Sequence, residues 1–294
     1  MEDAIQFEKM IKEFSGFKLG PLNFTLEPGK VLGYIGPNGS GKTTTMQCLT
    51  GLLRPESGYV KIFGEVNDPN ETGWKSKIGY VGDKHVFYEN WSCARNLKFV
   101  SQFYPSWSDK RAEDLIKRFD LDANKEVAKL SKGNRAKLSL IQALAHDPQL
   151  LILDEPMDGL DPVIRSEFTN VLFEVIENEE RAIFYSTHIT SEIGRLCDEL
   201  AFLDNGSLKL KTEKETLLEK WRTISFQSTN HDLKLPGVVE QKVSGNEFII
   251  KTQDFESTLT ALRELSISDI TETRLSIEDI AIHILKGGRN VESL

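Results

Sequence analysis

The sequence predicts an α/β fold built on a mostly parallel sheet, and three observations support this prediction. A glycine-rich segment, Gly36 to Thr43, lies between an apolar run at 31–35 and a run at 44–49 that reads as a helix. Further apolar runs alternate with plausible helices, at 150–153, 182–185 and 200–203. Apolar strands that alternate with helices are typical of parallel sheets buried on both faces. After Trp221 the pattern changes, which indicates a second, smaller unit.

Length and composition narrow the possible classes of protein. The chain has 294 residues, 39 % hydrophobic and 28 % charged, enough for one large core and a second small one. The formal net charge of −9 argues against a nucleic-acid partner, because such binding rests on clustered Lys and Arg. No apolar stretch approaches the roughly 18 to 20 residues of a membrane-spanning helix, so we expect a soluble, cytosolic chain. Cys48, Cys93 and Cys197 form no Cys-x-x-Cys pair, so neither a disulfide framework nor a zinc site is predicted.

The first part of the chain is predicted to hold short strands and then a helical segment. Residues 5–32 read as strands, and two more β-rich pieces lie at 59–63 and 78–81. From 92 to about 146 the apolar residues recur at helical spacing, with Ser108 as a helix N-cap. We therefore expect a β-subdomain followed by a helical subdomain.

The two units are predicted to divide at residue 222. Residues 1–222 form the main domain and 223–294 an accessory α+β lobe. The lobe is indicated by a β-hairpin over 238–251 and by two amphipathic helices. Ser276 and Asp279 match the capping pattern ahead of the second helix.

The glycine-rich segment is a candidate phosphate cradle. The segment and the residue after it are Gly36, Pro37, Asn38, Gly39, Ser40, Gly41, Lys42, Thr43 and Thr44. Glycines let the backbone approach an anion, and the new helix directs its positive end to the same place. Lys42 is expected to reach the β- and γ-phosphates of a nucleotide, and the Thr43 hydroxyl to ligate Mg²⁺. The strand-to-helix context favours this P-loop over an ordinary glycine-rich turn.

Two adjacent acids, Asp154 and Glu155, follow the apolar run at 150–153. They should lie at the carboxyl edge of the sheet, where ligands of open α/β folds bind. We expect Asp154 to hold the Mg²⁺ hydration shell, and Glu155 to orient and deprotonate an attacking water.

Five motifs in order identify a resemblance to the ATP-binding subunits of ABC transporters. They are Gly36 to Thr43 (Walker A), Leu130 to Asn134 (signature), Leu150 to Glu155 (Walker B), Gly159 to Pro162 (D-loop) and Ser186 to His188 (switch histidine). The resemblance covers about residues 5–220 and implies a P-loop NTPase core of ABC type that binds and hydrolyses ATP. The 103–107 stretch and the Ser-Lys-Gly signature look closest to bacterial exporter-like subunits of the YtrB, bacitracin and peptide-toxin groups.

The resemblance also implies an ATP site shared between two subunits. In the family, the signature of one subunit binds the γ-phosphate of ATP held by the other, which here concerns Ser131, Lys132, Gly133 and Asn134. These residues lie just before a predicted helix, whose N-terminus suits an anion. A chain with one P-loop and one signature is therefore expected to pair with a second copy of itself, or with a related ATPase subunit, around two ATP molecules.

Three further residues receive roles from the resemblance, each beside a structural alternative. His188 is similar to the histidine that contacts the γ-phosphate and the attacking water; a lone histidine after a strand is more often structural, but the order of the motifs favours the functional role. Asp161 is similar to a carboxylate that spans the dimer, although an N-cap of the next helix explains it equally well. Phe14 stands where the family has an aromatic that stacks on adenine, whereas Phe17 is an alternative and a core role for either remains open.

Two departures from the family pattern put roles in doubt. Asp83 occupies the place of a glutamine near the phosphates; it is shorter and charged, so a contact with Mg²⁺ or its water is an expectation of its own. Lys132 replaces the first signature glycine and Asn134 the glutamine. Lys132 either adds positive charge near the opposed phosphate or points to solvent.

The implied function is that of an ATP-hydrolysing motor for a separate membrane permease, bound at the cytoplasmic face of the membrane. In the family, the region that here holds Phe87, Tyr88, Trp91, Phe99, Phe103, Tyr104 and Trp107 forms a groove for helices of the membrane subunit. Export of a peptide, antibiotic or similar amphipathic compound is expected from the resemblance alone. The alternative is a soluble ABC ATPase acting on DNA or ribosomes, which the single cassette and the absence of sustained heptads disfavour. The 223–294 lobe is expected to serve packing or dimerisation, with ligand sensing as the alternative.

Overall fold

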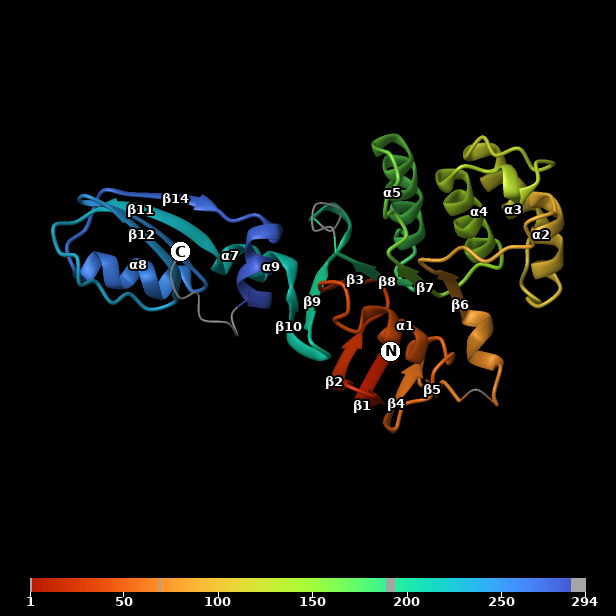
Figure 1. The fold of residues 1–294 in the computed structure, drawn as a ribbon, viewed down its shortest axis with the longest axis horizontal. Helices are drawn as coiled ribbons and strands as arrows, with labels where there is room; N and C mark the ends of the chain where they lie inside the picture. The colour runs from red at the N-terminus through yellow and green to blue at the C-terminus, as the bar shows by residue number, and fades with distance from the viewer. Residues whose placement is uncertain (1, 69, 189–193, 287–294) are drawn as a thin grey trace.

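The computed structural model describes residues 2–68, 70–188 and 194–286, which contain three β-sheets (Figure 1). The central sheet has six strands in the order β10-β9-β3-β8-β7-β6. Their bounds are β3 (Val31–Ile35), β6 (Ile78–Val81), β7 (Leu150–Asp154), β8 (Ala182–Thr187), β9 (Glu199–Asp204) and β10 (Ser207–Glu213). Strands β9 and β10 pair antiparallel, while the remaining pairings are parallel. The predicted α/β class with a mostly parallel sheet is confirmed.

An antiparallel sheet lies on one side of the central sheet. Its order is β2-β1-β4-β5, with bounds β1 (Ile5–Phe14), β2 (Phe17–Leu26), β4 (Ser57–Ile62) and β5 (Glu65–Val66). Helix α1 (Lys42–Leu49) shares a hydrophobic cluster with this sheet and with the central one. A 3-10 helix, η1 (Gly73–Lys77), leads into β6.

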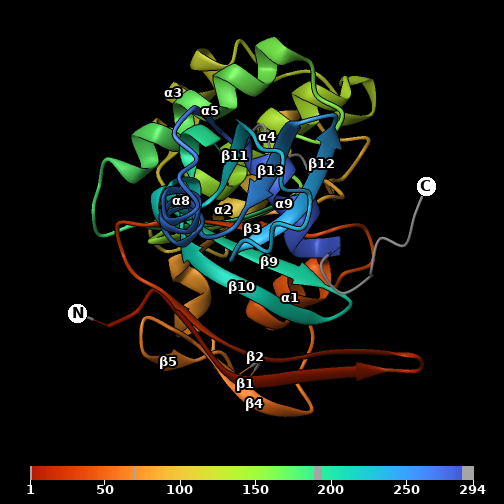
Figure 2. The same cartoon turned by 90° about the vertical axis from the view of Figure 1, so that its left-hand side faces the viewer.

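The helices between β6 and β8 lie on the opposite side of the central sheet, as Figures 1 and 2 both show. They are α2 (Cys93–Ser101), α3 (Asp109–Arg118), the 3-10 helix η2 (Val127–Lys129), α4 (Lys132–Leu144) and α5 (Pro162–Ile176). Ser108 caps α3 as the sequence indicates, because its hydroxyl accepts a hydrogen bond from the Arg111 N–H at 3.1 Å. Helix α4 contacts both α2 and α3, so these helices form one layer over β6 and β7.

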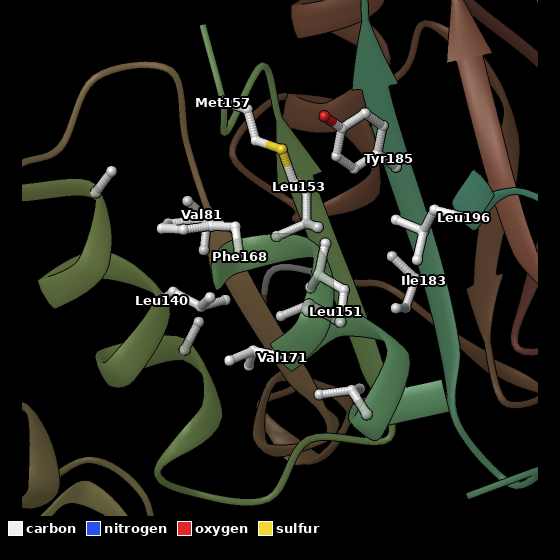
Figure 3. Packing of buried hydrophobic residues seen from close by; sticks show 14 of the residues in the cluster. Val81, Leu140, Leu151, Leu153, Met157, Phe168, Val171, Ile183, Tyr185 and Leu196 are labelled. Carbon is white, nitrogen blue, oxygen red and sulfur yellow. The ribbon is translucent and has the colours of Figure 1, made fainter. Parts of the chain in front are cut away.

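The central sheet is buried on both faces, and successive residues of β7 show how. Leu151 and Leu153 pack with α4 and α5, where Figure 3 shows them beside Leu140 and Phe168. Leu150 and Ile152 belong instead to the cluster that contains α1 and the antiparallel sheet. Because side chains of a strand alternate between faces, a continuous apolar run is what a strand between two layers requires.

The accessory lobe has its own sheet and a small core. The sheet order is β12-β13-β11-β14, with bounds β11 (Arg222–Gln227), β12 (Val238–Ser244), β13 (Glu247–Thr252) and β14 (Ile270–Arg274). Helix α8 (Phe255–Glu264) contributes Leu262 to a core with Ile224, Phe226, Phe248 and Ile250.

The last described helix, α9 (Ile277–Lys286), packs against the main domain and not within the lobe core. Ile277 and Ile280 join the large cluster of the main domain, together with Leu217 of α7 (Lys214–Lys220) and Trp221. Helix α9 also contacts β9 and β10. The chain therefore leaves the main domain at residue 222, forms the lobe, and returns to the main domain with α9. A single boundary at residue 222, as predicted from the sequence, does not describe this return.

Candidate active site

The P-loop connects β3 to α1 and holds a lysine ammonium over its own carbonyls. Gly39 and Gly41 have φ angles of +81° and +111°, which favour glycine. The Lys42 ammonium donates to the Gly36 carbonyl at 2.7 Å and to the Pro37 carbonyl at 3.3 Å. The Lys42 side chain is only 6 % exposed, so the loop presents a fixed positive charge.

A cavity of about 590 Å³ opens over this loop. Its lining residues are Phe17, Asn38, Gly39, Gly41, Lys42, Thr43, Thr44, Asp83, Glu155, Asp158 and His188. They come from the P-loop, from the ends of β6, β7 and β8, and from the start of β2, so the cavity lies at the carboxyl edge of the parallel strands.

Asp154 ends β7 and is almost fully buried. The Ser186 hydroxyl of the neighbouring strand donates to its Oδ1 at 2.6 Å. Burial raises the pKa of Asp154, which hydrogen bonds from Ser186 and Thr43 partly oppose. The same charge, together with burial, raises the pKa of Tyr80 on β6 to about 12. Asp154 is therefore a buried carboxylate that shares hydrogen bonds with the hydroxyl groups of Ser186 and Thr43.

Glu155 contacts both the P-loop lysine and His188. Its φ of +51° is left-handed, a conformation that costs a non-glycine residue roughly 1–2 kcal/mol, and its N–H is fixed by the Ser186 carbonyl at 3.2 Å. Its Oε1 lies 3.1 Å from Lys42 Nζ, and its Oε2 lies 2.6 Å from His188 Nδ1. A carboxylate only accepts hydrogen bonds, so Nδ1 of His188 carries the proton in this contact. A carboxylate so oriented at the cavity is suited to accept a proton from water.

The donor set fits a magnesium ion. The Thr43 hydroxyl and the Asp154 carboxylate are hard oxygen donors that already share a hydrogen bond. Within the described ranges, no three His, Cys, Asp or Glu side chains are arranged to hold a metal ion by themselves. Magnesium commonly takes one or two protein carboxylates and completes its shell with phosphates and water. The site thus suits a magnesium ion that arrives with a nucleotide.

Comparison with known proteins identifies the family. Residues 19–158 match the family model described as ABC transporter. NatA, an ABC transporter ATP-binding protein of Bacillus subtilis (strain 168), is 32 % identical over 210 residues, which cover 69 % of this chain and 84 % of NatA. This chain belongs to the ABC transporter family.

Further relatives agree with this assignment of an ABC ATP-binding subunit. BcrA, a bacitracin transport ATP-binding protein of Bacillus licheniformis, is 29 % identical over 282 residues, covering 91 % of this chain and 92 % of BcrA. Among solved structures, CbiO1 of Clostridium perfringens, part of the ABC transporter complex CbiONQ, matches with a TM-score of 0.64 at 26 % identity. That match covers 75 % of this chain and 92 % of CbiO1. The expectation of an ABC ATPase that binds and hydrolyses ATP is confirmed.

The ABC signature lies at the start of α4 and away from the P-loop cavity. Ser131 is the N-cap, and its hydroxyl accepts from the Asn134 N–H at 3.2 Å. A Cβ on Gly133 would lie 2.2 Å from Ile164 Cδ1, so glycine permits the close approach of α5. Among the described residues that line the cavity, none comes from the signature. The Lys132 ammonium lies 3.3 Å from Asp158 Oδ2 and its side chain is 58 % exposed, so both alternatives for this residue stay predictions.

Asp161 of the ABC D-loop is a helix cap in this structure. Its Oδ1 accepts from the N–H groups of Val163 at 3.0 Å and Ile164 at 3.1 Å, which is the structural alternative noted from the sequence. Its role across a dimer remains a prediction.

The aromatic predicted to stack on adenine is not a lining residue of the cavity. Phe14 is 46 % exposed, with the Lys12 ammonium 5.4 Å from its ring centre, whereas Phe17 lines the cavity. Adenine stacking by Phe14 stays a prediction, and Phe17 gains support from its place. Asp83 does line the cavity, next to the P-loop.

Sequence reasoning missed two residues near the site of this ABC ATPase. Asp158 lines the cavity, with its Oδ1 3.9 Å from His188 Nε2. Tyr80 places its phenol near the charge of Asp154. The signal for Asp158 was its place three residues after Glu155, on the loop that leads from β7 to α5. Nothing in the sequence around Tyr80 sets it apart from other strand residues.

Proposed function

We propose that this ABC ATPase is the motor subunit of a transporter whose membrane permease is a separate polypeptide, and that it works at the cytoplasmic face of the membrane. Two copies, or one copy and a related subunit, close around two ATP molecules, and hydrolysis separates them. The expected cargo is a peptide, an antibiotic or a similar amphipathic compound. In the described residues no helix is both long and apolar enough to cross a membrane.

The observation that carries this proposal is an exposed apolar groove on the helical layer. It has a volume of about 320 Å³ and is lined by Val86, Phe87, Tyr88, Asn96, Phe99, Val100 and Gln142. Val86 is 85 % exposed and Tyr88 50 %, and Tyr88 stacks on Trp91 with ring centres 4.2 Å apart. Rigid aromatic side chains held at a surface are typical anchors for a protein partner.

The position of this groove suits the transmission of force. The groove begins at Val86, three residues after Asp83, which lines the nucleotide cavity. A shift of the 82–86 segment upon phosphate binding therefore moves the groove floor. The partner that fits is a short amphipathic helix on the cytoplasmic side of a permease, lying with its apolar face on the aromatics.

The site supports a division of catalytic roles, which we propose for this chain. Lys42 binds the β- and γ-phosphates, and Asp154 and Thr43 hold Mg²⁺, with Asp83 near its water shell. The ion, when bound, would offset the negative charge of the phosphates. Glu155 accepts the proton of the attacking water, and His188 fixes the carboxylate through the 2.6 Å contact.

The location of the signature supports the dimer. Ser131 is the exposed N-cap of α4, and the buried Gly133 follows in the first turn. A helix N-terminus suits an anion, yet neither residue is among the described residues that line the chain's own cavity. A second subunit therefore has to supply the signature that completes each site. The rate per subunit should rise with protein concentration, and a rate unchanged by dilution would contradict the shared site.

Export is proposed from relatives, since BcrA is a bacitracin transport protein and CbiO1 is part of a transporter complex. The decisive experiment captures the Glu155→Gln variant with ATP from native membranes and identifies what copurifies. A multi-span permease is the expected partner. Ribosomes or DNA-bound proteins in its place would overturn the proposal.

For the accessory lobe we propose a packing or dimerisation role. Its core is small and apolar, and no group of three His, Cys, Asp or Glu side chains that could hold a metal ion lies among the described residues. Deletion of 223–274 with a short linker to α9 would keep α9 on the main domain. A weaker dimer is the expected result, with basal hydrolysis retained at protein concentrations high enough for two copies to meet. Loss of ligand-dependent control with the dimer intact would favour a sensor.

A further inference from the structure

A series of polar side chains in close contact runs from the P-loop to the signature within one copy of this protein. Lys42 Nζ lies 3.1 Å from Glu155, and Glu155 lies 2.6 Å from His188 Nδ1. His188 Nε2 is 3.9 Å from Asp158 Oδ1, and Asp158 Oδ2 is 3.3 Å from Lys132 Nζ. Asp158 is thus the link between the catalytic cavity and the signature surface.

The backbone around Asp158 is built to allow this contact. Its N–H donates to the Glu155 carbonyl at 3.2 Å, which closes a turn directly after Glu155. Gly159 follows with φ +64°, and a Cβ there would lie 2.6 Å from Lys132 Nζ. Glycine therefore leaves room for the lysine side chain to cross the loop and reach Asp158.

The ion pair between Lys132 and Asp158 contributes little to folding stability, so another anion can readily replace Asp158 as the partner of Lys132. The two side chains are 58 % and 43 % exposed. Ion pairs between side chains this exposed contribute little to folding stability, because solvent screens them. A phosphate carries more negative charge than one carboxylate and accepts stronger hydrogen bonds, so it competes well for an ammonium.

We propose that Asp158 and the γ-phosphate of the ATP held by the partner subunit compete for Lys132, and that Asp158 thereby couples the two ATP sites of a dimer. This inference rests on the shared-site dimer proposed above. When the partner's phosphate takes Lys132, Asp158 is released to accept a hydrogen bond from Nε2 of His188, which lies 3.9 Å from its Oδ1 and donates when the imidazole carries a proton on both nitrogens. Asp158 then acts as a positioning residue that holds the imidazole of His188 against Glu155. ATP bound in one site thus prepares the hydrolytic groups of the other.

If the two sites are coupled in this way, substitutions of Asp158 and Lys132 should shift the ATP concentration at half-maximal rate in opposite directions. Asp158→Asn keeps the size of the side chain and removes its charge, so Lys132 is free for phosphate and the ATP concentration at half-maximal rate falls. Lys132→Ala loses the phosphate contact, so that concentration rises. Both variants lose the link between sites, so we expect a Hill coefficient for ATP above 1 in the wild type and about 1 in each variant. Coupling of this kind typically amounts to about 5- to 150-fold in affinity, so shifts of at least about fivefold are expected.

The experiment measures steady-state hydrolysis against ATP concentration for the two variants, the double variant and Lys132→Arg. The double variant should behave as Lys132→Ala, because Asp158 acts through Lys132 on the affinity, and Lys132→Arg should keep the cooperativity. Glu65→Gln is the matched control, since Glu65 pairs with Lys77 at 2.8 Å and is 47 % exposed, outside the site. It should leave both constants unchanged.

Several results would overturn the inference. They are shifts of the same sign in the two single variants, additive effects in the double variant, or wild-type cooperativity in Asp158→Asn. The rate of the wild type at different protein concentrations keeps this separate from the proposed function. If that rate shows a dimer while the variants show no coupling, only the role of Asp158 is wrong.

Discussion

Lys42 Nζ lies 3.1 Å from Glu155 Oε1, so the ammonium expected to bind phosphate is paired with the carboxylate expected to activate water. Nucleotide phosphates therefore compete with Glu155 for Lys42. A change in Glu155 is therefore expected to alter phosphate binding by Lys42 as well as the activation of water.

Glu155→Gln should consequently have two effects. Hydrolysis should fall by about 10²- to 10⁴-fold, because general-base assistance supplies that factor. ATP affinity should rise, because the amide no longer pairs with Lys42. Turnover and equilibrium nucleotide binding of the purified variant check the two effects, and unchanged turnover would refute the assignment of Glu155.

Asp154→Asn should raise the thermal stability of the nucleotide-free protein at neutral pH. Burial raises the pKa of Asp154 in the folded protein, so its charged form opposes folding. As pH rises between the unfolded and folded pKa values, the folded state alone keeps the proton and stability declines; above the folded value the cost is complete.

The gain in Tm from Asp154→Asn should therefore be largest at pH 7–8 and shrink as pH falls below the folded pKa. Each kcal/mol corresponds to roughly 2–4 °C for a chain of this size class. Calorimetry across pH measures it, with Asp109→Asn, an exposed carboxylate, as the control. A gain that is constant or grows toward acid would contradict this account.

Ile280→Ala should destabilise the main domain, although it lies beyond the lobe in sequence. Ile280 is fully buried in the large cluster, and deletion of such a side chain costs about 2–5 kcal/mol. Ile250→Ala, equally buried in the lobe core, is the matched comparison. Hydrogen exchange should show weaker protection of β9 and β10 in the first variant and of β11 and β13 in the second. The reverse pattern would show that α9 belongs to the lobe.

Val86→Asp should abolish copurification with the permease. Val86 is 85 % exposed, so a charge there costs little folding stability but cannot be buried under a partner helix. Leu52→Asp is the control, because Leu52 is 68 % exposed and lies outside the groove. Equal loss of capture by both variants would mean that the groove is not the docking surface.

The local features of the site could be predicted from the sequence because contiguous residues make them. The strand, glycine loop and helix around Lys42 are one segment, and the caps at Ser131 and Asp161 depend on N–H groups two or three residues away. The unbroken apolar run of β7 likewise predicts a strand covered on both faces. In the structure, Leu151 and Ile152 belong to different hydrophobic clusters, one on each face of the sheet.

By itself, then, the sequence determined the fold class, the phosphate loop and the two carboxylates at the end of β7. Only the tertiary structure decided that Lys132 reaches Asp158, 26 residues away, that Phe17 and not Phe14 lines the cavity, and that α9 packs on the main domain. The physical reason is that periodicity shows which face of a helix or strand is buried, without showing what covers it. Contacts between distant segments depend on the order of strands in the sheet, and that order is fixed by the packing of the whole core.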